Sequence, residues 1–566
     1  MASQLTLFEL EPDLLIRNSI SKLSCAEWKE RGAVYTQRKV VDFILDLMGY
    51  SSDIPLFQYR ILEPCFGRGD FLFPIIERLL NSWRKSNRPV SILSRALYAV
   101  ELNQRTFDET REKVVQYLVQ SGISSKRGSF LADQWMIQGD FLLKAIKDKF
   151  SFIAGNPPYL RQERIPEPLL MEYRRRYCSM FDRADLYVPF IERSLSLLSQ
   201  GGILGFICAD RWMKNRYGGP LRRMVSENYR LKTYVDMAET QAFQTKVAAY
   251  PAITIISREK RGPTRTIYRP EINERTLSQI VSDVHAAALP NDSQVQEILI
   301  PAKNSAPWLL KSPDRIDLIR RLESAFPTLE EVGAKVGIGV ATGADKVFIA
   351  DYAKLDVEES RKLPLATTSD IKTGIMNWKG LGVINPFCGD GSLVDLNDYP
   401  KLEHYLTQYR DIIVKRHCVH KNPEKWYRTI DRIQADLTIR AKLLIPDIKG
   451  SANIVFDSGQ YYPHHNLYYV ISDDWDLRAL QSVLKSRIAS LFIENYSTQI
   501  RGGYLRFQAQ YLRRIRVPFW KDVPVPLRKK LAAAAVSNDN DLRDLLVFEL
   551  FGLTKKEIST IMSKRK

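Results

Sequence analysis

The tetrapeptide Asn156-Pro157-Pro158-Tyr159 follows an apolar run, residues 150–154, that is typical of a buried strand in a parallel sheet. It therefore lies at the carboxyl end of a strand, where open α/β sheets bind their ligands. Two successive prolines fix φ and remove two backbone donors, so carbonyl oxygens remain as acceptors beside an amide and a phenol ring. This group suits an amino group on a flat ring. The amine would donate to the Asn156 side-chain oxygen and the Pro157 carbonyl, and Tyr159 would stack on the ring.

Three further strand ends carry groups that suit a nucleoside-like ligand. A short apolar strand ends at Glu63 and leads into a turn with Gly67 and Gly69, which let the backbone approach a ligand closely. A glycine turn alone is weak evidence, because many such turns serve packing. The next two strands end at Glu101, a carboxylate suited to ribose hydroxyls, and near Asp140, which can accept from an adenine amino group.

These motifs together resemble the S-adenosylmethionine-dependent N6-adenine DNA methyltransferases of the gamma motif order, the TaqI-type modification enzymes. In that order a segment that grips the methionine end of the cofactor precedes the glycine turn, and residues 32–41 are similar to it. The family usually has proline at the position of Gln37, which implies a less rigid loop here. Cys65-Phe66 stands where Ala-Cys is commoner.

The resemblance implies a Rossmann-like α/β catalytic sheet that binds S-adenosyl-L-methionine, followed by a mixed α+β target-recognition domain with a helical C-terminal cap. The cofactor-binding residues that it implies are Tyr35, Thr36, Glu63, Gly67, Gly69, Glu101, Asp140, Phe141 and Pro158.

Downstream, Asp185 opens an amphipathic helical segment, and residues 203–207 and 252–256 are typical of buried strands. In the family an aromatic residue before the last of these strands forms the second wall against the target adenine, and Phe243 matches that position. A Phe before a strand also commonly packs in a core. Lys246 is placed to reach the base or a phosphate, although an exposed lysine needs no such role.

The chemistry that the resemblance implies is methyl transfer to an adenine amine, which is a poor nucleophile because it is conjugated with its ring. Hydrogen bonds to Asn156 and Pro157 would aim the nitrogen lone pair at the methyl group. The base must first be flipped out of the duplex, at a cost of about a few kcal/mol. Stacking on Tyr159 and Phe243 recovers roughly 1–3 kcal/mol per aromatic contact.

Length and charge agree with a large DNA-binding protein. A chain of 566 residues exceeds what one hydrophobic core normally supports, so we expect at least two domains. Lysine and arginine number 83 against 65 acidic residues, a net charge of +18, which suits double-stranded DNA as a partner.

The six cysteines have no CxxC spacing, which indicates a reducing cytoplasm and argues against a structural zinc site. His417, His420 and the pair His464-His465 are interpreted as surface or packing residues, so no metal is assigned. We find no apolar stretch long enough to span a bilayer and no secretion signal at the N-terminus. The expected location is the cytoplasm of a bacterium or archaeon, on DNA.

The break at Gly262-Pro263 predicts four parts: an N-terminal extension over 1–20, the catalytic domain over 21–262, the target-recognition domain over 263–522 and a helical segment over 523–566. Residues 337–349 read as strand, glycine turn and strand, and with residues 442–448 and 499–507 they resemble elements of the TaqI-type recognition domain. Arg501, Tyr504 and Arg506 lie near glycines there, and we expect them to contact DNA bases or phosphates.

Two alternative functions are considered, and the first also uses this tetrapeptide. It also occurs in release-factor glutamine methyltransferases and some RNA methyltransferases, which are generally shorter and have no basic domain of this size. A catalytically silent DNA-binding subunit is the second alternative, and the intact cofactor and catalytic motifs argue against it. A restriction nuclease is implied by the resemblance, and we expect it to be encoded separately from this chain, which we expect to be a monomer.

The segment Gln4-Leu5-Thr6-Leu7-Phe8 resembles the short peptide by which bacterial repair proteins dock on the sliding clamp. Leucine and phenylalanine near an N-terminus also commonly pack on their own domain. The sequence thus raises the sliding clamp as a second partner.

Overall fold

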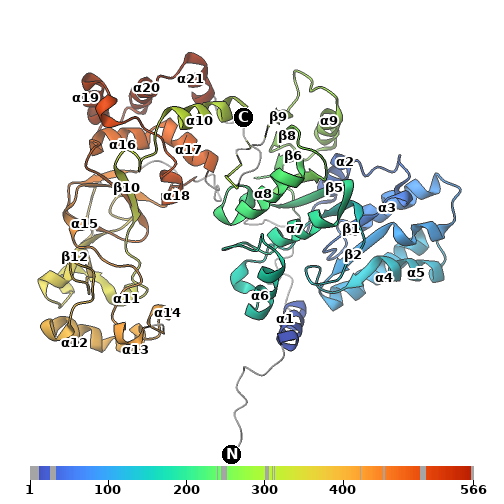
Figure 1. Ribbon diagram of the computed structural model, residues 1–566, viewed down its shortest axis with the longest axis horizontal. Coiled ribbons are helices and arrows are strands. Elements are labelled where there is room, and N and C mark those ends of the chain that lie inside the picture. The colour runs from blue at the N-terminus through green and yellow to red at the C-terminus, as the bar shows by residue number, and fades with distance from the viewer. Residues whose placement is uncertain are drawn as a thin grey trace, which may run out of the picture. The chain divides into compact units, whose positions relative to one another are not determined.

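The computed structural model describes residues 12–25, 34–238, 240–243, 251–299, 305–308, 310, 313–420, 422–449, 453–496 and 505–562. The chain divides into two compact units, Met1–Pro313 and Asp314–Lys566 (Figure 1). Each unit has its own β-sheet structure and its own buried apolar residues.

Among the described residues of the first unit, nine strands form one sheet in the order β3-β2-β1-β4-β5-β7-β6-β8-β9. Strands β3, β2, β1, β4 and β5 are parallel to one another, and β7 runs antiparallel between β5 and β6. The strands are β1 (Ile61–Glu63), β2 (Leu97–Glu101), β3 (Met136–Gln138), β4 (Phe150–Gly155), β5 (Leu198–Ala209), β6 (Arg230–Asp236), β7 (Pro251–Ser257), β8 (Thr264–Tyr268) and β9 (Gln296–Ile298).

The central strands are buried on both faces, which explains their continuous apolar runs. All of β7 is buried, and so are five of the six residues of β4. Parallel sheets covered by helices produce this pattern, because neither face meets water. The predicted Rossmann-like sheet and the predicted strand before Asn156 are therefore confirmed.

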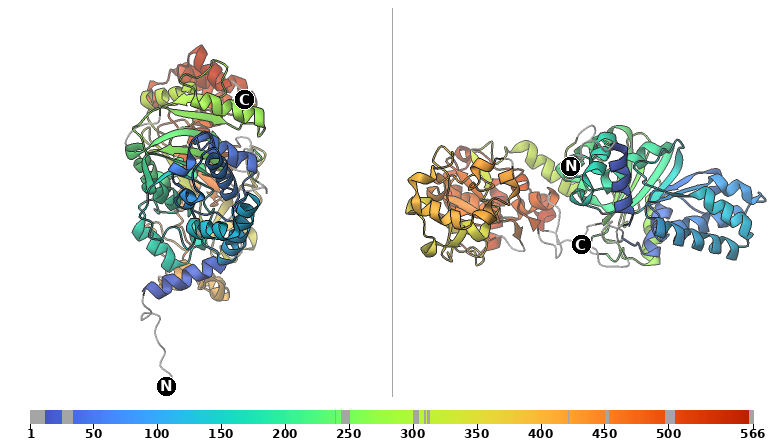
Figure 2. Two further views of the ribbon diagram at one scale, coloured as in Figure 1. Left: turned by 90° about the vertical axis from the view of Figure 1, so that its right-hand side faces the viewer. Right: turned by 90° about the horizontal axis from the view of Figure 1, so that it is seen from below.

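Helices cover the sheet of the first unit. Helices α4 and α5 pack against β2 and β3, α2 and α7 pack against β5, and α1 lies against α6 (Figures 1 and 2). No described helix is both long and apolar enough to cross a membrane. The helices are α1 (Pro12–Cys25), α2 (Arg38–Leu47), α3 (Leu72–Arg84), α4 (Gln104–Gln120), α5 (Ser125–Trp135), α6 (Glu167–Arg176), α7 (Tyr187–Leu197), α8 (Gly219–Asn228) and α9 (Glu274–His285).

The first unit extends beyond the predicted catalytic boundary at residue 262 and ends at Pro313. The reason is strand pairing: β8 pairs in parallel with β6, and β9 pairs antiparallel with β8. The Gly262-Pro263 break is thus a turn between two strands of one sheet and not a linker between domains.

The second unit contains two sheets of four described strands, ordered β10-β18-β14-β16 and β11-β13-β12-β17, and a ladder of β15 with β19. Its strands are β10 (Ala334–Ile338), β11 (Ile349–Asp351), β12 (Lys362–Ala366), β13 (Leu381–Ile384), β14 (Lys442–Pro446), β15 (Ile448–Lys449), β16 (Val455–Asp457), β17 (Tyr462–Pro463), β18 (Leu467–Ser472) and β19 (Leu505–Arg506).

Helices join and follow these strands, and the last three occupy the region predicted to be a helical segment. They are α10 (Pro313–Ala325), α11 (Asp345–Phe348), α12 (Pro400–Gln408), α13 (Arg410–Ile413), α14 (His417–His420), α15 (Asp436–Ile439), α16 (Leu477–Lys485), α17 (Arg487–Tyr496), α18 (Ala509–Leu512), α19 (Val525–Ala534), α20 (Asn540–Leu550) and α21 (Lys555–Met562). The sequence predicts strand, glycine turn and strand over residues 337–349. In the structure, the helical turn α11 lies between the glycine turn and the second strand, β11.

Candidate active site

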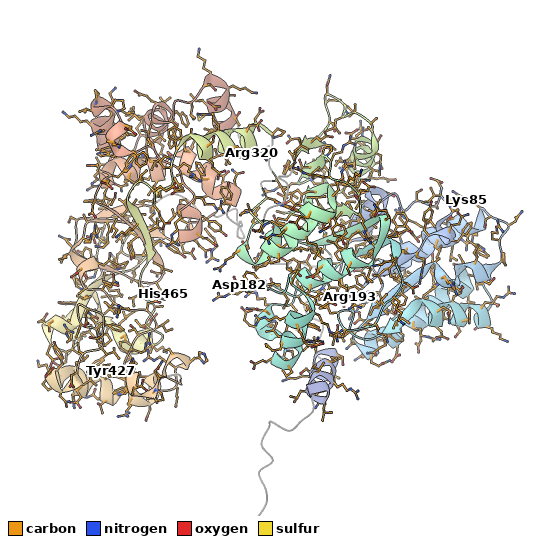
Figure 3. All side chains as sticks on the ribbon, viewed as in Figure 1. Lys85, Asp182, Arg193, Arg320, Tyr427 and His465 are labelled. Carbon is orange, nitrogen blue, oxygen red and sulfur yellow. The ribbon has the colours of Figure 1, made fainter. Side chains whose placement is uncertain are left out.

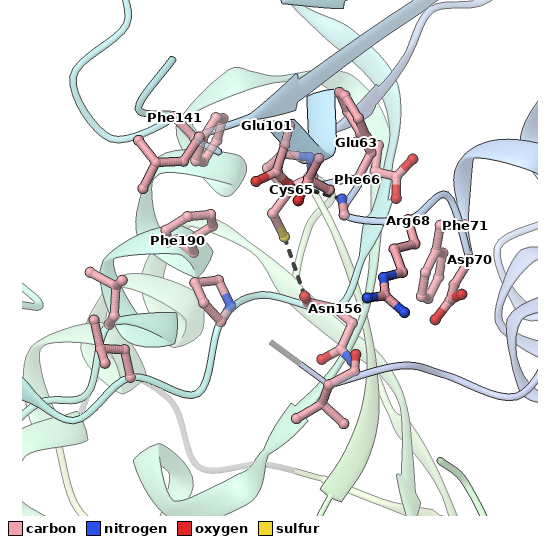
Figure 4. Close-up of a pocket in the computed structure, with 18 of the residues that line it drawn as sticks. Glu63, Cys65, Phe66, Arg68, Asp70, Phe71, Glu101, Phe141, Asn156 and Phe190 are labelled. Carbon is pink, nitrogen blue, oxygen red and sulfur yellow. Dashed lines mark hydrogen bonds between the residues drawn. The ribbon is translucent and has the colours of Figure 1, made fainter. Parts of the chain in front are cut away.

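A pocket of about 1000 Å³, counting its open mouth, lies at the carboxyl ends of the parallel strands of the first unit (Figure 4). Of the predicted cofactor-binding residues, all except Gly69 line it, and Asn156 lines it as well. The carboxyl ends of the strands are the usual place of ligand sites in open α/β sheets.

The turn after β1 requires both of its glycines. Gly67 and Gly69 have φ values of +53° and +94°, a region that L side chains rarely adopt. A Cβ atom on Gly69 would lie 2.5 Å from a ring carbon of Phe73, so the position has no room for a side chain. The turn is held in place because the Gly67 N–H donates to Glu101 Oε2 across 3.0 Å.

Glu101 is the last residue of β2, and Asp140 follows the end of the neighbouring strand β3 by two residues. Both side chains are buried. Glu101 Oε1 accepts from the Asn103 N–H at 2.8 Å. Asp140 Oδ1 accepts from the Leu142 N–H at 2.7 Å, and Oδ2 accepts from the Tyr173 hydroxyl at 2.5 Å. Burial raises the pKa of Asp140, and these two hydrogen bonds oppose that rise. Both carboxylates are thus positioned by the fold before any ligand binds.

Three acidic side chains gather at the glycine turn. Glu63 Oε2 is buried and has no hydrogen-bond partner among the described residues. Burial, with the carboxylates of Asp70 and Glu101, raises the pKa of Glu63 well above its usual range. Asp70 accepts from the Thr36 N–H at 2.7 Å, and burial raises its pKa. Figure 4 shows Glu63, Asp70 and Glu101 around the same pocket.

Sequence reasoning missed Asp70 and Tyr173. Asp70 directly follows Gly69, so its place after the glycine turn was a usable signal. Tyr173 comes from α6 and reaches Asp140 across 33 residues of sequence, and no local pattern points to it.

The side-chain amide of Asn156 is held by two donor bonds. Nδ2 donates to the Val34 carbonyl at 2.8 Å and to Thr36 Oγ1 at 3.2 Å. The Val34 carbonyl can only accept, so the end of the amide that contacts it is the nitrogen. Oδ1 is buried and has no partner among the described residues. The backbone carbonyl of Asn156 accepts from the Cys65 thiol at 3.2 Å (Figure 4), and burial raises the pKa of that thiol.

Tyr159 and Phe243 lie beside each other next to this amide. Their ring centroids are 6.3 Å apart and the rings are nearly perpendicular, at 86°. Tyr187 is a further aromatic neighbour of Tyr159, with ring centroids 6.4 Å apart. Phe243 also packs against the apolar core of the unit, so it contacts both the core and the tyrosine.

The segment with Gln37 is tied to the segment with Phe243. Thr36 and Phe243 form an antiparallel bridge, and the Gln37 N–H donates to the Ala242 carbonyl at 3.0 Å. A proline at position 37 could not make this bond. Any residue other than proline allows this backbone bond, and the lower rigidity of the loop stays a prediction.

The predicted DNA-contacting residues are only partly within the described residues. Arg506 forms an ion pair with Asp447 within the second unit. Lys246, Arg501 and Tyr504 lie outside the described residues, as does the predicted clamp peptide Gln4 to Phe8.

Two family models match parts of this chain, and related proteins match nearly all of it. A family model described as Eco57I restriction-modification methylase matches residues 82–243, and one described as TaqI-like C-terminal specificity domain matches residues 387–517. Type II methyltransferase M.PaeR7I of Pseudomonas aeruginosa is 58% identical over 94% of this chain and 93% of its own length. M.XhoI of Xanthomonas vasicola is 50% identical over 93% of this chain and 98% of its own length.

A solved structure of the Type IIL restriction-modification enzyme MmeI in complex with DNA shares the fold. Its TM-score is 0.60, with 13% identity, over 97% of this chain and 76% of that chain. Fold, pocket and relatives together define a DNA methyltransferase. The chain belongs to the Type II methyltransferases of restriction-modification systems. The family resemblance predicted from the sequence is confirmed.

Proposed function

We propose that this protein transfers a methyl group from S-adenosyl-L-methionine to N6 of adenine at one DNA sequence, after flipping that adenine out of the duplex. The observation that carries the proposal is the buried, unpartnered Oδ1 of Asn156. A buried acceptor without a partner costs free energy, about 1–3 kcal/mol, unless a ligand supplies a donor. An exocyclic amine is such a donor.

The roles of Asn156 and Pro157 follow from the fixed amide. Because Nδ2 is engaged by Val34 and Thr36, the atom of the amide left for a ligand is Oδ1. An amide oxygen only accepts, so a target amine would present an N–H to it. The Pro157 carbonyl is the second acceptor. Two such bonds draw the nitrogen toward tetrahedral geometry and direct its lone pair. The proton leaves to water after the nitrogen has become cationic, so no strong general base is needed.

The pocket residues fit S-adenosyl-L-methionine. When bound, this cofactor supplies a methyl group activated by a sulfonium centre. Glu101 suits the ribose hydroxyls, and Asp140 suits the adenine amino group. Glu63 and Asp70, beside Tyr35 and Thr36, suit the cationic methionine amine, and the unpaired Glu63 Oε2 is a free acceptor there. Phe141 and Pro158 supply the apolar walls for the adenine ring of the cofactor.

Tyr159 and Phe243 are proposed to hold the flipped adenine. Since the two rings are nearly perpendicular, a base that stacks on the Tyr159 face meets Phe243 edge-on. Both arrangements are favourable between aromatic rings. Stacking thereby offsets part of the cost of leaving the duplex.

Site specificity is assigned to the second unit, which contains the match to the TaqI-like specificity domain over residues 387–517. The net charge of +18 supports binding to the phosphate backbone. Because the alignment with M.PaeR7I covers 94% of this chain at 58% overall identity and so includes most of the second unit, we infer that this chain modifies the same target sequence as that relative.

Plasmid DNA from cells that express this chain tests the proposal. Single-molecule sequencing should report N6-methyladenine at one fixed sequence, and cells with the Asn156→Ala variant should yield unmodified plasmid. Unmodified plasmid from both would favour a protein-glutamine or RNA methyltransferase, or a silent DNA-binding subunit. Modified cytosine would contradict the adenine assignment.

A further inference from the structure

Asp345, His464 and His465 form a cluster in the second unit, which is the unit that does not contain the methyl-transfer pocket. One possible metal-ligand atom from each residue lies within 4.8 Å of the others. His464 Nε2 lies 3.4 Å from Asp345 Oδ2, and the two imidazole rings have centroids 4.0 Å apart. Asp345 and His465 are exposed, so solvent reaches the cluster (Figure 3 labels His465).

Backbone hydrogen bonds bring the two chain segments of this cluster together. The Val340 N–H donates to the Pro463 carbonyl at 2.9 Å, and the His465 N–H donates to the Val340 carbonyl at 3.0 Å. A Cβ atom at Gly339 would lie 2.3 Å from the carbonyl oxygens of Pro463 and His464, so only glycine permits this approach. The cluster therefore rests on backbone that is fixed on both sides.

The side chains of the cluster are also partly fixed. Thr342 Oγ1 donates to Asp345 Oδ1 at 2.5 Å, which leaves Oδ2 directed at the His464 ring. His464 Nδ1 is buried and has no hydrogen-bond partner among the described residues. The ring nitrogen that faces Asp345 is Nε2, so Nε2 is the His464 atom available to an ion shared with that carboxylate.

Two imidazoles and one carboxylate are a ligand set for transition metals. Imidazole nitrogen suits Zn²⁺, Co²⁺ and Ni²⁺, whereas Mg²⁺ and Ca²⁺ prefer oxygen ligands. We propose that Asp345, His464 and His465 bind one divalent transition-metal ion, with Zn²⁺ as the representative, and that the ion joins residues 339–345 to the turn that carries the two histidines. Three protein ligands leave at least one coordination position for water or another oxygen ligand.

The test is a cobalt titration of the full-length chain without a histidine tag, after dialysis against a chelator. Co²⁺ should bind at one equivalent per chain and produce a visible absorption band, and Zn²⁺ should displace it. Changing His465→Gln, which alters an exposed side chain, or Asp345→Asn should weaken Co²⁺ binding by at least about tenfold, in line with loss of one ligand. The variants His404→Gln and His417→Gln are matched controls and should bind as the unaltered chain does.

Absence of stoichiometric Co²⁺ binding would overturn the proposal and leave an Asp345–His464 hydrogen bond with water at the second ring nitrogen. Binding lost in the His417→Gln variant but kept in the His465→Gln variant would also overturn it, because the ion would then sit near α14. Metal binding is read directly by absorbance, so either outcome leaves the proposed methyl transfer unaffected.

Discussion

The amide nitrogen of Asn156 donates to the hydroxyl oxygen of Thr36 across 3.2 Å, joining the strand-end tetrapeptide to a segment 120 residues earlier in the chain. Thr36 is 1% exposed, so water does not compete for this bond. A second bond, to the Val34 carbonyl, holds the same nitrogen. The orientation of the Asn156 amide therefore depends on the segment that is also proposed to hold the methionine end of the cofactor.

Thr36→Val should lower kcat without changing the KM for DNA. Valine keeps the shape of threonine but cannot accept the bond from Asn156, so the amide loses one of its two restraints. A neutral hydrogen bond contributes about 1 kcal/mol, which corresponds to roughly a fivefold fall in rate. Steady-state methylation of a DNA duplex measures both constants, and Thr36→Ser, which keeps the hydroxyl, is the control. Equal rates for the Val and Ser variants would contradict the positioning role.

Asp140→Asn should weaken cofactor binding by roughly 10- to 100-fold, because hydrogen bonds to a charged group are worth about 1.5–3 kcal/mol. Tyr173→Phe removes only the hydroxyl that supports the carboxylate, so its effect should be smaller. Isothermal calorimetry with S-adenosyl-L-methionine measures both. An unchanged dissociation constant for Asp140→Asn would remove this residue from the site.

Phe243→Leu distinguishes stacking from core packing. Leucine retains apolar bulk but has no aromatic ring. If Phe243 contacts the flipped base, the Leu and Ala variants should both lose activity on paired DNA, and both should lose less when the target adenine is mispaired, because flipping then costs less. If Leu restores full activity, the contacts with the core explain the residue.

The burial of Asp185 predicts that the free energy of unfolding depends on pH. Burial raises its pKa to about 6 from a usual 3.8, against the opposing charges of Arg211 and Arg161. The folded state binds the Asp185 proton more tightly than the unfolded state does. Proton binding therefore contributes to the stability of the folded protein below about pH 4, and this contribution is lost as pH rises toward 6. Asp185→Asn cannot titrate.

As pH rises from about 4 to 6, the Asp185→Asn variant should therefore gain stability relative to the unaltered protein. The difference between their unfolding free energies should change by about 1–3 kcal/mol over this range and stay constant above it. Urea unfolding at a series of pH values measures it. A difference that does not change with pH would show that Asp185 titrates normally in the folded protein.

The elements of the site with local signals were predictable from the sequence. The apolar run of β4 and the two prolines placed Asn156 at a strand end, because a strand buried on both faces needs apolar residues throughout. Gly67 and Gly69 marked the turn after β1, because positive φ values favour glycine.

Contacts between distant segments were not predictable. The bonds from Asn156 to Val34 and from Tyr173 to Asp140 join residues whose spacing follows no local period. The first unit also ends later than predicted, because β8 pairs with β6 and so belongs to the same sheet. A turn and a linker share the same local composition, so the glycine-proline break at residue 262 could not distinguish them.

Methyl transfer to N6 of adenine through the Asn156 amide is tested most directly by following the methyl group itself. Purified protein is incubated with its DNA and S-adenosyl-L-methionine that carries a deuterated methyl group, and the DNA is digested to nucleosides for mass spectrometry. We predict deuterium label in N6-methyladenine for the unaltered protein and a loss of at least about 100-fold for Asn156→Ala, as for removal of one transition-state hydrogen bond, with DNA binding retained. Label in a cytosine derivative, or undiminished N6-methyladenine with Asn156→Ala, would contradict the account.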